Sequence, residues 1–184
     1  MSTLNAITSG AGGVALSGDT SGNLTIQSAG VNVATFTSTG MISNVGAPAF
    51  SAYASSNQSI TTGWNKVALN AKEFDTNNNF NTSTNRFTPT VAGYYQISGG
   101  VAGVSAITTG EYLISIYKNG SEYKRGIDIP NGASLYSLQV SSLVYFNGST
   151  DYIELYCYNN AGSPTPLYGQ TWATYMTGSM VRSA

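Results

Sequence analysis

Few residues in this chain have the types and spacing that catalysis requires. The 184 residues include no histidine, which excludes a Ser-His-Asp triad, a Cys-His pair and any histidine-ligated metal. The eight acidic residues are dispersed, and only Glu73 and Asp75 alternate closely along an expected strand. A two-carboxylate hydrolase also needs a cleft, which nothing in the sequence marks. We therefore expect a protein that is not an enzyme and that has no cofactor.

The single cysteine and the basic residues exclude further kinds of site. Cys157 cannot form an intrachain disulfide, and its place between Tyr156 and Tyr158 in an apolar strand predicts a buried thiol. The seven basic residues are scattered, with Lys124 and Arg125 as the only adjacent pair. Nucleic-acid binding needs a clustered basic face, so we expect none. The N-terminus has no signal-peptide pattern, and no apolar run is long enough for membrane insertion.

The elements that position these side chains are expected to be strands. Only 8% of residues are charged and 41% are hydrophobic, so the chain can bury a core. Short alternating runs separated by Gly, Asn, Ser and Pro dominate, and no helical period is sustained. The pairs Asn119-Gly120 and Asn147-Gly148 tolerate the positive φ angles of tight turns. They predict two antiparallel hairpins, one joining residues 112–118 to 121–125 and the other joining 138–146 to 152–158.

The segment 151–158 alternates so cleanly that its two faces can be assigned. Ile153, Leu155 and Cys157 share one face, which is the natural core side. Tyr152, Tyr156 and Tyr158, here called the tyrosine row, lie with Glu154 on the other face. Tyrosine suits a wet interface, because its ring packs while its hydroxyl stays solvated. The tyrosine row is therefore a candidate contact between subunits, the alternative being a covered inner face of a two-sheet sandwich.

The first 46 residues differ in texture from the rest. Between residues 11 and 40, short alternating pieces are separated by Gly every few residues, and they end in Phe36 and Gly40. One such piece cannot bury its apolar side alone, whereas three chains wrapped together could. The segment resembles the shaft and neck repeats of phage tail-fibre and spike proteins. That resemblance implies a β-rich neck at residues 1–46 that attaches to other virion proteins, with a head at 47–184.

Residues 80–97 carry the most informative pattern in the chain. They place a turn, a short strand and a proline break before Gly93 and an aromatic strand. The order resembles the central signature of C1q/TNF-like jelly-roll heads, aromatic-Asp-x-x-Thr-Gly-x-Phe-x-x-Pro-x-x-Gly-x-Tyr. Asn81 and Asn85 stand where that family usually has Asp and Gly. The matching positions are Phe80, Thr84, Phe87, Gly93 and Tyr95, with Pro89 in or beside the proline position.

The resemblance continues in order along the head. Residues 48–52, 112–120, 143–155 and 176–181 resemble the family's opening, middle, paired and closing strands. The resemblance implies an all-β fold of two antiparallel sheets, a jelly roll whose first and last strands lie together, assembled as a homotrimer. Some family members bind Ca²⁺, for which Asp128, Asp151, Glu73 and Asp75 are the candidate ligands here. The expected core residues are Phe87, Tyr95, Ile97, Ile114, Ile116, Leu143, Ile153 and Leu155.

These inferences predict a structural protein of a bacteriophage virion. The expected form is a trimeric projection on the virion surface, made in the host cytoplasm, whose head binds a host receptor or glycan. The alternatives are a capsid decoration protein and a cellular C1q-like adhesin or carbohydrate-binding module. Trp64, Tyr168 and Trp172 are the candidate receptor-binding residues. Four polar loops are expected to be apical, at residues 57–64, 107–111, 126–134 and 159–172. Trp64 ends the first of them, and Tyr168 and Trp172 lie in the last.

Overall fold

The computed structural model describes residues 22–37, 42–43, 46–104, 110–129, 136–162 and 164–184, and every regular element among them is a strand. The chain divides into two compact units, Met1–Gly46 and Ala47–Ala184. No helix in these described segments is long and apolar enough to cross a membrane.

The first unit contains a small antiparallel sheet. Its strands are β1 (Leu24–Ser28), β2 (Val31–Phe36) and β3 (Ile42–Ser43), in the order β1-β2-β3. The β1–β2 turn is formed by Ala29 and Gly30, which both have positive φ. Leu24 pairs with Phe36 and Ile26 with Ala34, so the apolar residues of the two strands share one face. Ile26 and Phe36 are 48% and 38% exposed.

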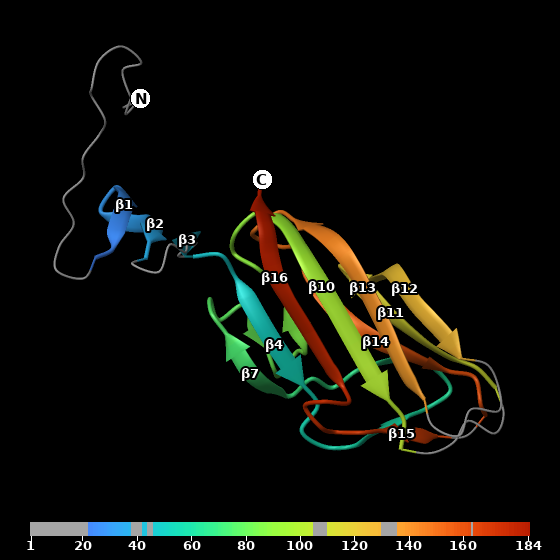
Figure 1. Cartoon of the computed structure of the whole chain (residues 1–184). Helices are drawn as coiled ribbons and strands as arrows, with labels where there is room; N and C mark the ends of the chain where they lie inside the picture. The colour runs from blue at the N-terminus through green and yellow to red at the C-terminus, as the bar shows by residue number, and fades with distance from the viewer. Residues whose placement is uncertain (1–21, 38–41, 44–45, 105–109, 130–135, 163) are drawn as a thin grey trace, which may run out of the picture. The chain divides into compact units, whose positions relative to one another are not determined.

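The second unit, the head, is built from two larger sheets and a two-stranded one. One sheet has the strand order β13-β10-β16-β4-β7, and Figure 1 shows β16 running between β4 and β10. The other has the order β12-β11-β14-β9-β8, with β6 also pairing with β14, and β15 pairs with β5. The strands are β4 (Ala49–Tyr53), β5 (Gln58–Ile60), β6 (Gly63–Lys66), β7 (Ala71–Asp75), β8 (Phe80–Asn81), β9 (Arg86–Phe87), β10 (Gly93–Ala102), β11 (Tyr112–Lys118), β12 (Ser121–Ile129), β13 (Ser137–Phe146), β14 (Ile153–Asn159), β15 (Thr165–Leu167) and β16 (Tyr175–Ser183).

An aromatic core lies between the two larger sheets. Phe87 stacks on Phe50 with ring centroids 4.1 Å apart and meets Tyr95 and Phe146 edge-on. These four rings are fully buried, and aromatic pairs of this kind add to the stabilisation from apolar burial. Seven of the expected core residues are confirmed as buried, namely Phe87, Tyr95, Ile97, Ile114, Ile116, Ile153 and Leu155.

The prediction for the eighth expected core residue, Leu143, is wrong, because this residue is 51% exposed. In β13 the inward positions are Leu138, Val140, Val144 and Phe146, which all have even numbers. Leu143 therefore points to the outer face. Both Leu143 and Val144 are apolar, so only the parity set by the rest of the strand decides which of them faces the core.

In the loop at residues 79–93, two Asn residues take the roles that Asp and Gly have in the family signature. Asn81 Oδ1 accepts hydrogen bonds from the amides of Ser83 and Thr84, as an aspartate would. Asn85 has a φ of 54°, the left-handed conformation that Asn tolerates best after Gly. At position 93 the chain keeps the family's glycine, because the Cβ of any other residue would lie 2.3 Å from the carbonyl oxygen of Arg182.

The two Asn-Gly turns have different roles. Asn119 and Gly120, with φ of 52° and 80°, close the β11–β12 hairpin, which confirms that prediction. The second prediction is wrong in its pairing, because β13 pairs with β10 whereas β14 pairs with β11. The turn at Asn147 crosses from one sheet to the other. Asn147 Oδ1 holds it by accepting hydrogen bonds from three successive amides, those of Ser149, Thr150 and Asp151.

The two ends of the head are set by the antiparallel pairing. Met180 donates its amide to the carbonyl of Pro48 and Ala184 to that of Ala92, so the first and last residues of the head share one end, the proximal end. β4 and β16 are paired, as the family resemblance implied. The opposite end, the distal end, holds the start of β16 and the strand β15 (Figure 1).

Candidate self-association and recognition surfaces

A cluster of large apolar side chains lies on the outer face of the β13-β10-β16 part of the first sheet. Tyr94 is 41% exposed, Leu143 51%, Tyr145 41% and Val181 57%. Tyr94 pairs across the strands with Tyr145, and their ring centroids lie 5.4 Å apart. We call these four side chains the outer apolar face.

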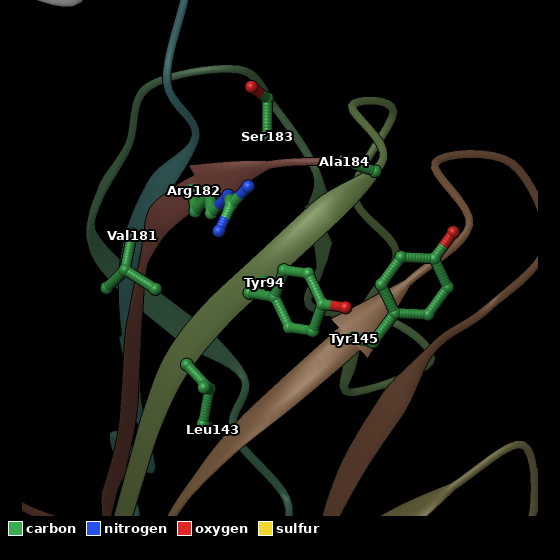
Figure 2. Close-up of a pocket in the computed structure, with 7 residues that line it drawn as sticks. All are labelled: Tyr94, Leu143, Tyr145, Val181, Arg182, Ser183 and Ala184. Carbon is green, nitrogen blue, oxygen red and sulfur yellow. The ribbon is translucent and has the colours of Figure 1, made fainter.

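The outer apolar face borders a shallow hollow of about 680 Å³ that the C-terminal residues 182–184 help to line. Figure 2 shows the two tyrosine rings side by side, with Leu143 on the same strand as Tyr145 and Val181 on β16, on the other side of β10. An isolated exposed leucine is ordinary in a soluble protein, but four large apolar residues on adjacent strands form a patch typical of a protein–protein contact. Because the tyrosine hydroxyls remain able to form hydrogen bonds, the patch suits a partly wet interface.

The tyrosine row lies on the other sheet. Tyr152, Tyr156 and Tyr158 are all half-buried by side chains of the same chain. Tyr156 stacks on Tyr117 with centroids 4.0 Å apart, and Tyr158 packs 5.2 Å from Trp64. Burial raises the pKa of Tyr117 and of Tyr156. The role of the row in a subunit contact stays a prediction.

Glu154, within the same face, is 1% exposed, which sequence reasoning did not anticipate. Its Oε1 accepts a hydrogen bond from Arg86 Nε at 2.8 Å and lies 3.1 Å from Lys66 Nζ. The hydrogen bond to Glu154 raises the pKa of Arg86. The guanidinium also lies 4.1 Å from the ring centroid of Tyr152, a cation–π contact.

Two of the three candidate receptor-binding residues come together at the distal end. Tyr168 and Trp172 have ring centroids 5.8 Å apart, and Trp172 is 69% exposed. The segment is held by a hydrogen bond from the Tyr168 amide to the carbonyl of Ala102 and by one from the Gly169 amide to Asn57 Oδ1. Trp64 instead lies on the sheet face, where it packs against aromatic rings of β11 and β14.

The loops expected to be apical gather at the distal end as far as they are described. Tyr112 pairs with Asn159, whose side chain donates to the carbonyl of Ile60 in β5. β5 pairs with β15, and Val104 donates its amide to Pro166 of that strand. Residues 105–109, 130–135 and 163, which belong to or adjoin the expected loops, lie outside the described residues.

The carboxylates considered for calcium are each held by protein donors where they are described. Glu73 Oε2 accepts a hydrogen bond from Ser51 Oγ at 2.7 Å, and Asp75 pairs with Lys72 at 3.0 Å. Asp151 pairs with Lys118 at 3.0 Å, whereas the side chain of Asp128 lies outside the described residues. Over the described part of the chain, no three His, Cys, Asp or Glu side chains come close enough to hold a metal ion.

The cysteine behaves as the sequence predicts. Cys157 is a free and fully buried thiol in the core. Burial raises its pKa to about 12. A thiol with so high a pKa carries almost no nucleophilic thiolate near neutral pH.

Comparison with known proteins identifies the fold. No protein-family profile and no curated protein sequence matches this chain. The globular domain of zebrafish complement 1qA matches with a TM-score of 0.55 and 19% identity, covering 74% of this chain and 99% of that one. A crystal structure of murine APRIL matches with a TM-score of 0.54 and 12% identity, covering 73% and 99%.

A third similar structure is the vertex protein P5 of phage PRD1, with a TM-score of 0.50 and 15% identity, covering 74% of this chain and 96% of that one. At these identities the similarity shows the fold alone. The head therefore has the C1q/TNF-like jelly-roll fold, and the predicted all-β architecture of two antiparallel sheets is confirmed.

Proposed function

We propose that this protein is a non-enzymatic, homotrimeric recognition head that assembles through its outer apolar face. The observation that carries the proposal is the cluster of Tyr94, Leu143, Tyr145 and Val181, exposed together on adjacent strands. A second and a third copy of the chain would remove these side chains from water, which is the main driving force of association. The C1q/TNF resemblance implies three copies rather than two.

The proposed setting is the surface of a bacteriophage virion. The tail-fibre-like texture of residues 1–46 supports attachment to other virion proteins through that segment, and the similarity of the head to the PRD1 vertex protein agrees with it. The head would then bind a host-cell glycan or protein. Capsid decoration is the first alternative, and a cellular C1q-like adhesin or carbohydrate-binding module is the second.

The proposed recognition surface is the distal end, because the proximal end joins the N-terminal segment. Tyr168 and Trp172 provide adjacent aromatic rings there, and Trp172 is the most exposed large hydrophobic residue of the described chain. Nearby side chains such as Asn57 and Gln170 are amides rather than charges. This composition favours a neutral ligand, held by ring faces and amide hydrogen bonds.

The test of assembly is the mass of the purified full chain by light scattering at micromolar concentration. We expect three times the chain mass of 19.2 kDa. Leu143→Asp combined with Val181→Asp should give a folded monomer, because charges on the patch cannot be buried without partners. Tyr123→Asp, which alters an exposed tyrosine on β12, is the matched control and should stay trimeric.

A wild-type chain that is monomeric in this measurement would refute the trimer. Dissociation by Tyr156→Asp but not by Leu143→Asp and Val181→Asp would move the contact to the tyrosine row.

Recognition is tested by attaching the wild-type protein to host cells and repeating the assay with Tyr168→Ala and Trp172→Ala. Saturation of particles that lack the protein, without any binding to cells or glycans, would favour capsid decoration.

A further inference from the structure

Aromatic rings form a continuous strip across the outer face of the second sheet. Trp64 of β6 meets Tyr117 of β11 edge-on at 5.6 Å and Tyr158 of β14 at 5.2 Å. Tyr117 in turn stacks on Tyr156 at 4.0 Å. We call these four residues, with Tyr152 and Arg86 at one end, the aromatic strip. All of its members keep part of their surface in solvent.

The rings of the aromatic strip are held in place before any ligand arrives. Each lies on or beside a paired strand, and two are flanked by guanidinium groups, with Arg125 5.6 Å from the ring of Trp64 and Arg86 4.1 Å from that of Tyr152. Preformed aromatic surfaces lose little conformational entropy on binding. Sites on rigid strands also position ligand groups more accurately than sites on loops.

The charged side chains in and beside the aromatic strip are paired within the chain. Arg125 holds Glu122 through two hydrogen bonds of 2.7 and 2.8 Å. Arg86 and Lys66 share the buried carboxylate of Glu154. Hydrogen bonding to Glu122 raises the pKa of Arg125, and Glu111 lies close enough to Arg125 to raise it further. The three cations are therefore balanced by three carboxylates, which leaves no net positive charge to attract a polyanion. The matching ligand is therefore neutral, with an apolar face for the rings and hydroxyls for the polar edges.

Neutral saccharides have this chemistry. A pyranose ring presents weakly positive C–H groups, which suit the negative face of an aromatic ring, and its hydroxyls can bond to guanidinium and phenol groups. From Tyr152 to Tyr158 the chain advances about 20 Å at roughly 3.3 Å per residue, longer than a single sugar. We propose that the aromatic strip binds a neutral oligosaccharide chain lying along β14.

This binding surface is separate from the distal aromatic pair, and it does not depend on trimer formation. The chain contains two tryptophans, Trp64 in the aromatic strip and Trp172 at the distal end, so two variants separate the surfaces. Trp172→Phe leaves Trp64 as the reporter, and Trp64→Phe leaves Trp172. Each variant of the full chain is titrated with dextran, laminarin and galactomannan oligosaccharides while its fluorescence and its quenching by iodide are measured.

We expect at least one of these saccharides to change Trp64 fluorescence saturably and to reduce its iodide quenching. The response should be the same at 50 and at about 300 mM salt, because no net charge is neutralised. Tyr156→Ala should weaken binding about tenfold, in line with the loss of one stacked ring. Arg125→Gln, at a side chain that is 53% exposed and so safe for the fold, should weaken it several-fold. Tyr123→Ala, an exposed tyrosine outside the aromatic strip, is the control and should bind normally.

Three results would overturn the proposal. The first is the absence of any Trp64 response to all three neutral saccharides. The second is a response of Trp172 alone, which would place the glycan at the distal end and leave the proposed function intact. The third is binding of oligo(dT) or alginate in preference to neutral sugars, with an affinity that falls steeply with salt. A monomeric mass would refute the trimer but not this binding site.

Discussion

Arg86 and Glu154 meet across two neighbouring strands although they are 68 residues apart, with Nε and Oε1 separated by 2.8 Å. The side chain of Glu154 is 2% exposed, whereas the side chain of Arg86 is 38% exposed. The contact therefore pairs a buried anion with a cation that remains partly hydrated. Lys66 donates to the same oxygen and also to the carbonyl of Thr84, so the pair belongs to a small network.

Removing this carboxylate charge should destabilise the head. We expect Glu154→Gln and Arg86→Met each to lower the free energy of unfolding by about 1.5–3 kcal/mol, the usual value for a hydrogen bond to a charged group. Urea unfolding of both variants and of the double variant measures their coupling. Because the two side chains touch, the double variant should lose less than the sum of the single losses. Simple additivity would mean that the contact contributes nothing of its own.

The turn at Gly120 should resist β-branched side chains. Its φ of 80° is unfavourable for valine, although the nearest atom to a new Cβ, the hydroxyl oxygen of Tyr152, lies 3.4 Å away. Gly120→Val should therefore cost about 1–3 kcal/mol through backbone strain rather than through a clash. Gly120→Asn is the matched control, because Asn tolerates positive φ, and its melting temperature should fall less. Equal losses in the two variants would contradict the backbone explanation.

The stability of the head should depend on pH through Asp151. Burial opposes ionisation of Asp151, but hydrogen bonds from Asn119, Lys118 and the amide of Asn147 outweigh it and lower its pKa. A lowered folded-state pKa stabilises the protein above the unfolded value of about 3.9. That contribution is lost as the pH falls below this value and through the folded-state pKa.

The corresponding experiment compares wild-type protein with Asp151→Asn by urea unfolding at several pH values. Wild-type protein should be the more stable near neutral pH, and the difference should shrink below about pH 4 as Asp151 is protonated. A difference that stays constant down to about pH 2 would show that Asp151 contributes no pH-dependent stability.

The buried thiol should be inert in the native protein. With a pKa of about 12, Cys157 should not react with a thiol reagent such as dithionitrobenzoate at pH 8 until the protein unfolds. Ser149→Cys adds a thiol at an exposed turn position and should react with one equivalent within minutes. Rapid labelling of wild-type protein under native conditions would mean that the core opens locally around β14.

Much of the head follows from local patterns in the sequence. The alternation of Ile153, Leu155 and Cys157 correctly assigns the core face of β14, since the side-chain period of a strand is two. The Asn119-Gly120 pair identifies the hairpin because the conformation of that turn depends on the turn residues themselves.

The errors arise where a local signal does not determine a distant partner. Asn147-Gly148 does mark a turn, but turn chemistry does not specify whether the two flanking strands pair or enter different sheets. Likewise, the adjacent apolar residues Leu143 and Val144 satisfy either choice of inward face. In the structure Val144 is fully buried and Leu143 is half exposed, so Val144 is the residue that faces the core.

The candidate surfaces were only partly predictable for the same reason. The tyrosine row was visible in the sequence, but its partners Trp64, Tyr117 and Arg86 come from other strands. The outer apolar face could have been suspected from Tyr94 and Tyr145, because outward positions in strands are usually polar. Its formation needs the order β13-β10-β16, which sequence periodicity does not specify.

The shared proximal position of the two chain ends of the head affects how it bears mechanical load. Five residue pairs, from Ala49–Ser179 to Tyr53–Tyr175, connect β4 to β16. Pulling Ala47 and Ala184 apart would load this ladder at one end and peel its hydrogen bonds in sequence. Pulling between Ala47 and the turn at Trp172 would instead shear β4 along β16, so that all five pairs resist together. The head should therefore resist tension between Ala47 and Trp172 better than tension between its two termini.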